Sequence, residues 1–302
     1  MQVEPREQIR AVTRDVNARG ARVRFVEAGE GPTLLLVHGY LASHVTWQDT
    51  LSALSRRFRV IAPDLPGFGE SEKPPASRYP YTFDAFAESL VDLVAALDLT
   101  RVSVCGHALG GAAALAMAAD HPDVVERLVL VSPPVYPVDI DPIVRIAMQP
   151  VVGPIFFKQL FGARLFRTHF HKYVHGRRAG VSSERLEYLY EVFNAPAARE
   201  AAYATMSAMH DTRSLVARLP RVTAPTLVAW GREDAANPLA HGRRLAREIR
   251  GARFEVFECG PSPALESPGP FVEAVTSFLL EGQPHPRERR PPGRGHDNGR
   301  VA

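Results

Sequence analysis

The stretch VSVCGHALGG, residues 102–111, decides the fold. An apolar run rich in β-branched residues stops at Gly106, and a helix of small residues is predicted directly afterwards, over 112–119. Gly106 and Gly110 flank Ala108 at the spacing G-x-X-x-G. Because glycine tolerates a close approach of the backbone, this pattern predicts a sharp strand-to-helix turn that holds residue 108 in a strained conformation at one edge of a sheet.

Further strands and helices are predicted on both sides of this turn. The first two strands alternate apolar and polar residues and indicate an antiparallel hairpin, whereas the later ones are apolar on both faces, as buried parallel strands are. Strands that alternate with helices predict an α/β fold with a mostly parallel eight-stranded sheet and helices on both faces. The other predicted strands are 11–16, 21–27, 32–37, 58–62, 125–131, 225–230 and 253–258, and the helices beside them are 47–56, 83–97, 238–249 and 271–280.

Between two of these strands the pattern changes to helix alone. Residues 133–217 contain no convincing strand, and apolar residues recur there at helical spacings. We therefore assign residues 1–132 and 218–282 to the sheet-containing core and 133–217 to an inserted helical cap. The Pro- and Arg-rich residues 283–302 lack apolar periodicity and are predicted to form a disordered C-terminal tail.

The elbow at residue 108 resembles the nucleophile elbow of the α/β-hydrolase superfamily, and the resemblance extends over residues 20–282. His38 and Gly39 end the strand that carries the oxyanion loop in that superfamily. The resemblance implies that the main-chain N–H groups of Tyr40 and Leu109 form the oxyanion hole. Both donors are backbone groups, so they do not depend on the side chain at the nucleophile position.

Two members of the catalytic triad that the resemblance implies are replaced. Ala108 stands at the nucleophile position, and a methyl group cannot attack a carbonyl. Asp234 occupies the acid position after a predicted strand. Residues 260–268, GPSPALESP, match the frame of the base histidine except that Pro261 stands in its place. Proline has neither a titratable group nor a backbone donor, so serine-esterase activity is not expected.

Other polar residues near these positions have structural interpretations. We interpret His107 as packing and Cys105 as core, and Ser262 has no base of its own. Asp64, in the family motif PDLPGFG of residues 63–69, is interpreted as capping a turn. No metal site and no cofactor are predicted, because the cap histidines lack a nearby cysteine or acidic pair; they are His169, His171 and His175.

Three functions remain open on these residues. The first is a non-hydrolytic pseudoenzyme that binds a small apolar molecule bearing a carbonyl or carboxylate. The second is a lyase, isomerase or cyclase that uses the oxyanion donors, with Asp234 or a cap residue as base. The third is a hydrolase by descent with residual or relocated activity. The residues expected to line a pocket are His38, Gly39, His107, Phe156, Phe161 and Phe166.

The charge and the hydropathy of the sequence limit the classes of binding partner that can be expected. The net charge of the 302-residue chain is +3, and the tail from Glu281 onward holds five arginines against three acids, so the rest is close to neutral. Binding to nucleic acid is therefore not expected. The chain shows no export signal and no apolar run near the ~20 residues of a membrane span. We expect a cytoplasmic protein with no membrane partner and two free thiols, and the oligomeric state stays open.

Overall fold

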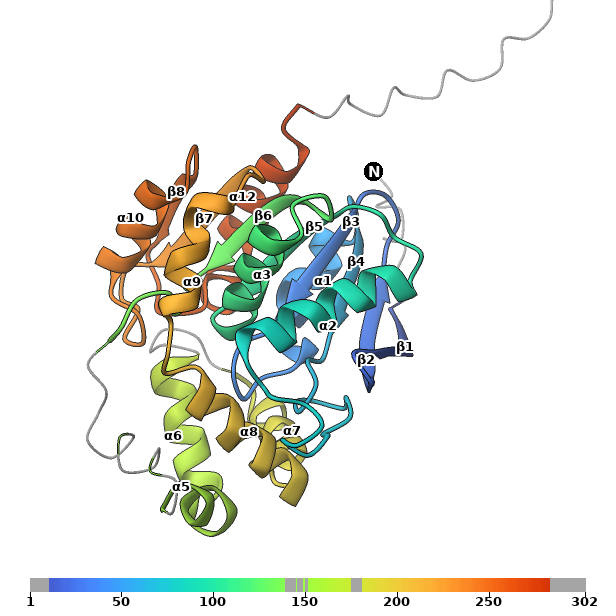
Figure 1. Cartoon of the computed structure of the whole chain (residues 1–302). Helices are drawn as coiled ribbons and strands as arrows, with labels where there is room; N and C mark the ends of the chain where they lie inside the picture. Colours follow the sequence, from blue (N-terminus) through green and yellow to red (C-terminus); the bar gives the residue numbers. More distant parts are fainter. Residues whose placement is uncertain (1–10, 139–144, 146–148, 150–151, 175–180, 283–302) are drawn as a thin grey trace, which may run out of the picture.

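The computed structural model describes residues 11–138, 145, 149, 152–174 and 181–282, and the predicted tail lies outside these ranges. Its centre is one eight-stranded sheet in the order β1-β2-β4-β3-β5-β6-β7-β8 (Figure 1). β1 and β2 form an antiparallel hairpin, β2 pairs antiparallel with β4, and all later pairs are parallel. The strands are β1 (Val12–Ala18), β2 (Ala21–Ala28), β3 (Thr33–Val37), β4 (Arg59–Pro63), β5 (Val102–His107), β6 (Val125–Val131), β7 (Thr226–Gly231) and β8 (Arg253–Phe257).

Two apolar layers cover the sheet because successive side chains of each strand point to opposite faces. Leu35 and Val104 belong to one buried cluster, while Leu34 and Cys105 belong to the other. The first layer is made by α2 (Phe83–Ala96), α3 (Leu109–Asp120) and α10 (Leu239–Glu248), and the second by α1 (Gln48–Leu54) and α12 (Pro268–Leu280). This arrangement confirms the predicted α/β architecture.

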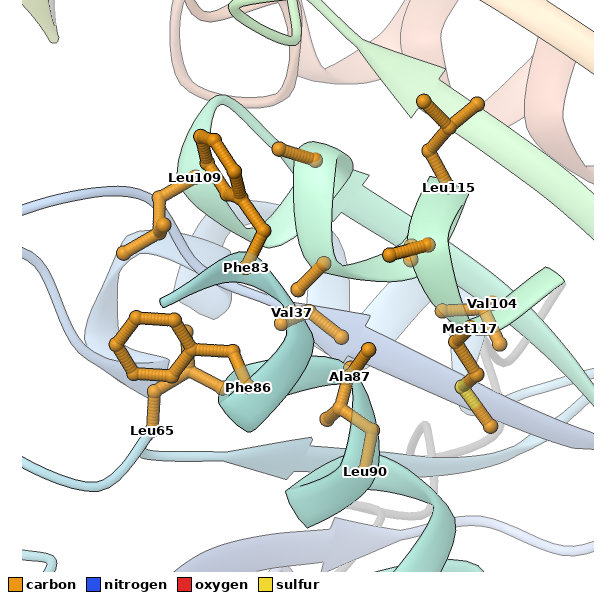
Figure 2. Packing of buried hydrophobic residues seen from close by; sticks show 14 of the residues in the cluster. Val37, Leu65, Phe83, Phe86, Ala87, Leu90, Val104, Leu109, Leu115 and Met117 are labelled. Atoms are coloured by element: carbon orange, nitrogen blue, oxygen red, sulfur yellow. The ribbon is translucent and has the colours of Figure 1, made fainter. Parts of the chain in front are cut away.

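The helix α3 after the elbow is packed on all sides. Apart from Asp120 at its end, every residue from Leu109 to Ala119 is buried, and most are alanine or glycine. Small side chains let the helix lie close to the sheet and to α2, where Phe83, Phe86 and Leu90 fill the space beside it (Figure 2). The predicted helix at 112–119 therefore begins three residues earlier, directly at the elbow.

Between β6 and β7, the described residues form helices and loops and no strand. We call the helices α5 to α8, with the turn η2, the cap: α5 (Val152–Ile155), the π-helical η2 (Phe156–Leu160), α6 (Ala163–Tyr173), α7 (Ser183–Phe193) and α8 (Pro196–Ala208). Figure 1 shows them at the end of the molecule away from most of the sheet. The chain returns to the sheet through α9 (Arg213–Arg218) and the 3-10 turn η3 (Leu219–Arg221), which pack on α3.

Smaller elements complete the loops around the sheet. The 3-10 turn η1 (His44–Trp47), which was not predicted, precedes α1, and α1 corresponds to the predicted helix 47–56. The short α11 (Pro263–Glu266) precedes α12. Cys105 and Cys259 are buried thiols that form no disulfide. Among the described residues, no helix has both the length and the apolar character needed to span a bilayer.

Candidate functional site

The backbone of the elbow is strained at Ala108, the residue expected at the nucleophile position. Ala108 has φ 47° and ψ −112°, and its N–H donates to the Val131 carbonyl at 2.9 Å. A Cβ on Gly106 would lie 2.3 Å from the Gly110 carbonyl oxygen, and one on Gly110 would lie 2.3 Å from that of Val37. Both glycines are therefore required. Backbone strain of this kind costs about 1–3 kcal/mol and is held by the surrounding packing.

The two predicted oxyanion donors lie on segments that meet beside Ala108. A Cβ on Gly39 would lie 3.4 Å from Ala108 Cβ, so the loop after β3 approaches the elbow closely. Leu109 is the first residue of α3, where a helical N–H has no acceptor within the helix. Among the described residues, neither Tyr40 nor Leu109 donates its N–H to a backbone carbonyl. Together with the helix N-terminus, these groups favour an oxyanion.

Asp234 lies in the turn after β7 with only half of its carboxyl group satisfied. Oδ1 accepts hydrogen bonds from the N–H groups of Ala236 and Asn237, both at 2.8 Å. Oδ2 is buried and accepts none from the described residues. Burial raises the pKa of Asp234 to about 6, against the opposing effect of the two N–H groups. The nearby Ser132 hydroxyl also lowers the pKa of Asp234, although its position does not meet the geometry of a hydrogen bond.

A carboxylate within the same segment holds the loop that carries Pro261. Glu266 accepts hydrogen bonds from the N–H groups of Gly260, at 3.0 Å, and Ser262, at 3.1 Å. Burial raises the pKa of Glu266, and the negative charge of Asp234 contributes, which places the two carboxyl groups in one region. The Asp234 and Pro261 loops touch, because Glu233 N–H donates to the Cys259 carbonyl at 2.9 Å.

Beside Ala108 and Pro261, the structure brings a serine and a histidine together. Ser262 Oγ lies 3.1 Å from His107 Nε2, which also lies 3.0 Å from the Pro261 carbonyl oxygen. A carbonyl only accepts, so Nε2 carries the proton, and the Ser262 hydroxyl donates instead to the Val174 carbonyl of the cap. Burial lowers the pKa of His107 to about 4. In this arrangement His107 cannot take the serine proton.

Both ring nitrogens of His38, a residue predicted to line the pocket, form hydrogen bonds with main-chain groups of the surrounding loops. Its Nε2 accepts the Leu65 N–H at 2.9 Å, so Nδ1 is the protonated nitrogen that donates to the Gly39 carbonyl at 2.7 Å. Burial lowers its pKa, so the ring is neutral. Asp64 accepts from the N–H groups of His44, at 2.7 Å, and Glu70, at 2.8 Å, and caps the turn as predicted. Both residues shape the loop that approaches the elbow.

Comparison with known proteins decides the family. A family model described as the alpha/beta hydrolase fold matches residues 32–268. The chain belongs to the α/β-hydrolase fold family. An uncharacterized protein of Mycobacterium tuberculosis is 31% identical over 276 residues, which cover 88% of this chain and 80% of that protein.

Several relatives with named activities are hydrolases. The 2-hydroxy-6-oxo-6-(2'-aminophenyl)hexa-2,4-dienoic acid hydrolase of Metapseudomonas resinovorans is 28% identical over 286 residues, covering 92% of this chain and 94% of the relative. A solved serine hydrolase involved in carbazole degradation is similar at a TM-score of 0.75 and 27% identity, covering 89% of this chain and 99% of that one. The similarity extends over the core and the cap.

In this α/β-hydrolase-fold chain, the predicted pocket phenylalanines pack mainly on other aromatic rings of the cap. Phe161 stacks on Phe157 at 5.2 Å between ring centroids and lies 5.7 Å from Phe156. Phe166 stacks on Phe193 of α7 at 5.2 Å. Phe161 and Phe166 are buried and Phe156 is half-buried, so these rings build the interior of the cap.

The link from the cap to the elbow runs through a histidine that sequence reasoning weighed only as a metal ligand. The His169 ring lies 6.1 Å from the Tyr40 ring and 6.3 Å from the Phe161 ring. Burial lowers the pKa of His169 to about 4, so the ring is neutral. Tyr40 donates its hydroxyl to the Ala202 carbonyl of α8 at 2.9 Å. The described residues contain no group of three or more potential metal ligands, and His175 lies outside them.

Proposed function

We propose that the protein is a non-hydrolytic member of the α/β-hydrolase fold family that binds a small, mostly apolar molecule beneath the cap, with one carbonyl or anionic oxygen at the elbow. The observation that carries this proposal is the strained backbone of Ala108, held at φ 47° where no side-chain chemistry is available. A strained backbone is costly, so its presence without a reactive side chain favours another role for the elbow. The N-terminus of α3 and the two main-chain N–H donors beside it are groups that bind an oxyanion.

Hydrolysis is disfavoured on chemical grounds. The Ala108 side chain has no nucleophilic atom, and the Pro261 side chain has no basic group to accept a proton. Ser262 donates its hydroxyl to the cap, and His107 faces it with a protonated nitrogen. Removal of triad members leaves roughly 10³–10⁴-fold catalysis over water, from binding and the oxyanion hole alone. A retained site without its reacting groups is therefore better suited to binding than to turnover.

The ligand class follows from the groups around the elbow. Two N–H donors would take one oxygen, while the neighbouring rings of Tyr40 and the neutral His169 offer aromatic surface. The hydrolase from Metapseudomonas resinovorans is named for a dienoic acid that carries an oxo group. A molecule with a carbonyl or carboxylate at one end and an apolar body would match both features, and we propose this class for the present chain.

A second candidate is an isomerase or lyase in which Asp234 acts as base. Its unpaired Oδ2 and a pKa of about 6 favour this function, because a base works best when its pKa lies near the operating pH. Asp234 would remove a proton next to a carbonyl, and the N–H groups of Tyr40 and Leu109 would hold the oxyanion that develops. The ligand class is the same in both candidates.

A thermal-shift screen against acyl, aromatic and oxo-dienoic acids tests the proposal. A rise in Tm is expected with some of these acids and not with their alkane analogues, which lack an oxygen for the two N–H donors. Ala108→Leu places a large side chain at the proposed binding position and should remove the shift, whereas the small variant Ala108→Ser should keep it. No acid-dependent shift in the wild type, or the same shift in Ala108→Leu, refutes binding at this site.

Mass spectrometry of the same mixtures in deuterated water separates the two candidates. A binding protein returns its ligand unchanged. An isomerase or lyase that removes a carbon-bound proton incorporates deuterium or alters the ligand, and Asp234→Asn should abolish this change. Release of an alcohol or carboxylic acid from an ester would instead show hydrolysis and contradict both candidates.

A further inference from the structure

Exposed apolar side chains gather in the first part of the cap. Four of the six large apolar side chains that are exposed among the described residues lie between Val152 and Leu165. Their exposed fractions are 42% for Val152, 50% for Ile155, 62% for Leu160 and 44% for Leu165. The neighbouring rings of Phe157 and Phe161 turn inward, so the π-helical turn η2 leaves Ile155 and Leu160 in solvent. Single exposed apolar residues are ordinary, but a group of four marks an interaction surface.

The same surface is basic. Lys158, Arg164, Arg167 and Lys172 are all exposed, and residues 152–174 contain no aspartate or glutamate. In the whole chain, by contrast, the charges are nearly balanced, with 36 basic and 33 acidic residues. The helix α6 is amphipathic: its buried face carries Phe166 and Phe170, and its exposed face carries the cations. We call the exposed residues of 152–172 the cap tip.

We propose that the cap tip docks on an anionic lipid bilayer surface. Lysine and arginine near an anionic leaflet are attracted electrostatically, while exposed leucine and isoleucine enter the boundary between headgroups and acyl chains. The cap tip combines both features. Figure 1 shows α5 and α6 at the end of the molecule away from most of the sheet, where a flat surface could reach them.

The geometry favours a bilayer over an acidic protein. Val152, Ile155, Leu160 and Leu165 project from a short helix, a turn and the start of α6, not from one continuous helix face. Such a set suits a deformable interface better than a complementary protein groove. The expectation of no membrane partner rested on the absence of a spanning segment, which peripheral docking does not need. Docking is independent of the proposed ligand, although a bilayer would be a source of apolar ligands.

Vesicle co-sedimentation of the full chain tests the proposal. We expect binding to vesicles of equal parts phosphatidylglycerol and phosphatidylcholine, weakened by salt, and little binding to phosphatidylcholine alone. Each cation near the surface contributes about fivefold, so Lys158→Gln with Arg164→Gln should lower the partition coefficient about 25-fold. Leu160→Ser with Leu165→Ser should also weaken binding. These residues are exposed, so the variants should fold normally.

The matched control removes the same charge at the opposite end of the sheet. Arg56→Gln with Arg57→Gln changes two exposed residues that precede β4, whereas the cap follows the carboxyl end of β6. This variant should bind vesicles within about twofold of the wild type. Three results overturn the proposal: no binding to anionic vesicles at low salt, equal loss in the control and cap variants, or a dimer in solution that Leu160→Ser with Leu165→Ser abolishes while vesicle binding is unchanged.

Discussion

Replacing Asp234 by asparagine is predicted to stabilise the protein at neutral and alkaline pH. Burial raises the pKa of Asp234 from 3.8 to about 6 in the folded state. A raised carboxyl pKa means that folding is favoured while the group is protonated, below pH 3.8, and that this contribution is lost as the pH rises through 6. Ionisation of Asp234 therefore lowers the free energy of unfolding by about 3 kcal/mol at pH 8 and by about 0.5 kcal/mol at pH 4.

Asparagine removes the charge and keeps the other contacts. Its Oδ1 can still accept from the N–H groups of Ala236 and Asn237, and its amide nitrogen can donate toward the Ser132 hydroxyl, which is also unpaired among the described residues. Asp234→Asn should therefore raise the free energy of unfolding by up to about 3 kcal/mol at pH 8, with the gain shrinking toward pH 4.

Urea unfolding followed by tryptophan fluorescence at pH 4, 6 and 8 measures this difference. The control is Asp211→Asn, because Arg213 holds the pKa of that exposed carboxyl at about 2. Its replacement should not stabilise the protein at pH 8. If Asp234→Asn destabilises the protein at pH 8, or changes stability equally at all three values, the carboxylate has a partner and the reasoning is refuted.

Three further predictions concern the elbow and the adjoining loop. Ala108→Ser together with Pro261→His should restore measurable hydrolysis of p-nitrophenyl esters while each single change should not, because triad members act as a unit; activity in either single variant would contradict this. Gly106→Ala places a Cβ 2.3 Å from a carbonyl oxygen and should lower the free energy of unfolding by about 2 kcal/mol or more, measured in urea, whereas Gly162→Ala, with open space around it, should not. Ser262→Ala removes one hydrogen bond to the cap, about 1 kcal/mol, and should speed amide exchange in α6; unchanged exchange would show that this bond does not hold the cap.

The sequence predicts local geometry well where the backbone requires particular residues. The elbow could be predicted because only glycine fits at Gly106 and Gly110, where any Cβ would meet a carbonyl oxygen. The parallel strands could be predicted because they are buried on both faces and are therefore continuously apolar in sequence. The hairpin could be predicted because its two strands alternate apolar and polar residues. The helix predicted over 47–56 agrees with α1, whereas the 3-10 turn η1 from His44 to Trp47 before it was not predicted.

Contacts across the sheet edge could not be predicted in the same way. Ser262 and His107 are 155 residues apart and meet only because their strands end at the same edge. The sequence contained one signal, that each residue adjoins a replaced triad position. The unpaired Oδ2 of Asp234 depends on how its turn satisfies Oδ1, which no spacing reveals. The contact of His169 with Tyr40 depends on how the cap sits, so the histidine pattern suggested a metal ligand instead.

The most direct test of a site without hydrolytic chemistry is intact-protein mass spectrometry after incubation with a fluorophosphonate. The wild-type protein should gain no covalent mass, since Ala108 has no nucleophile and the Ser262 hydroxyl donates to the cap beside a protonated His107 nitrogen. The variant with Ala108→Ser and Pro261→His should gain the mass of one adduct. A wild-type adduct that maps to Ser262 would show a relocated serine hydrolase and contradict the account.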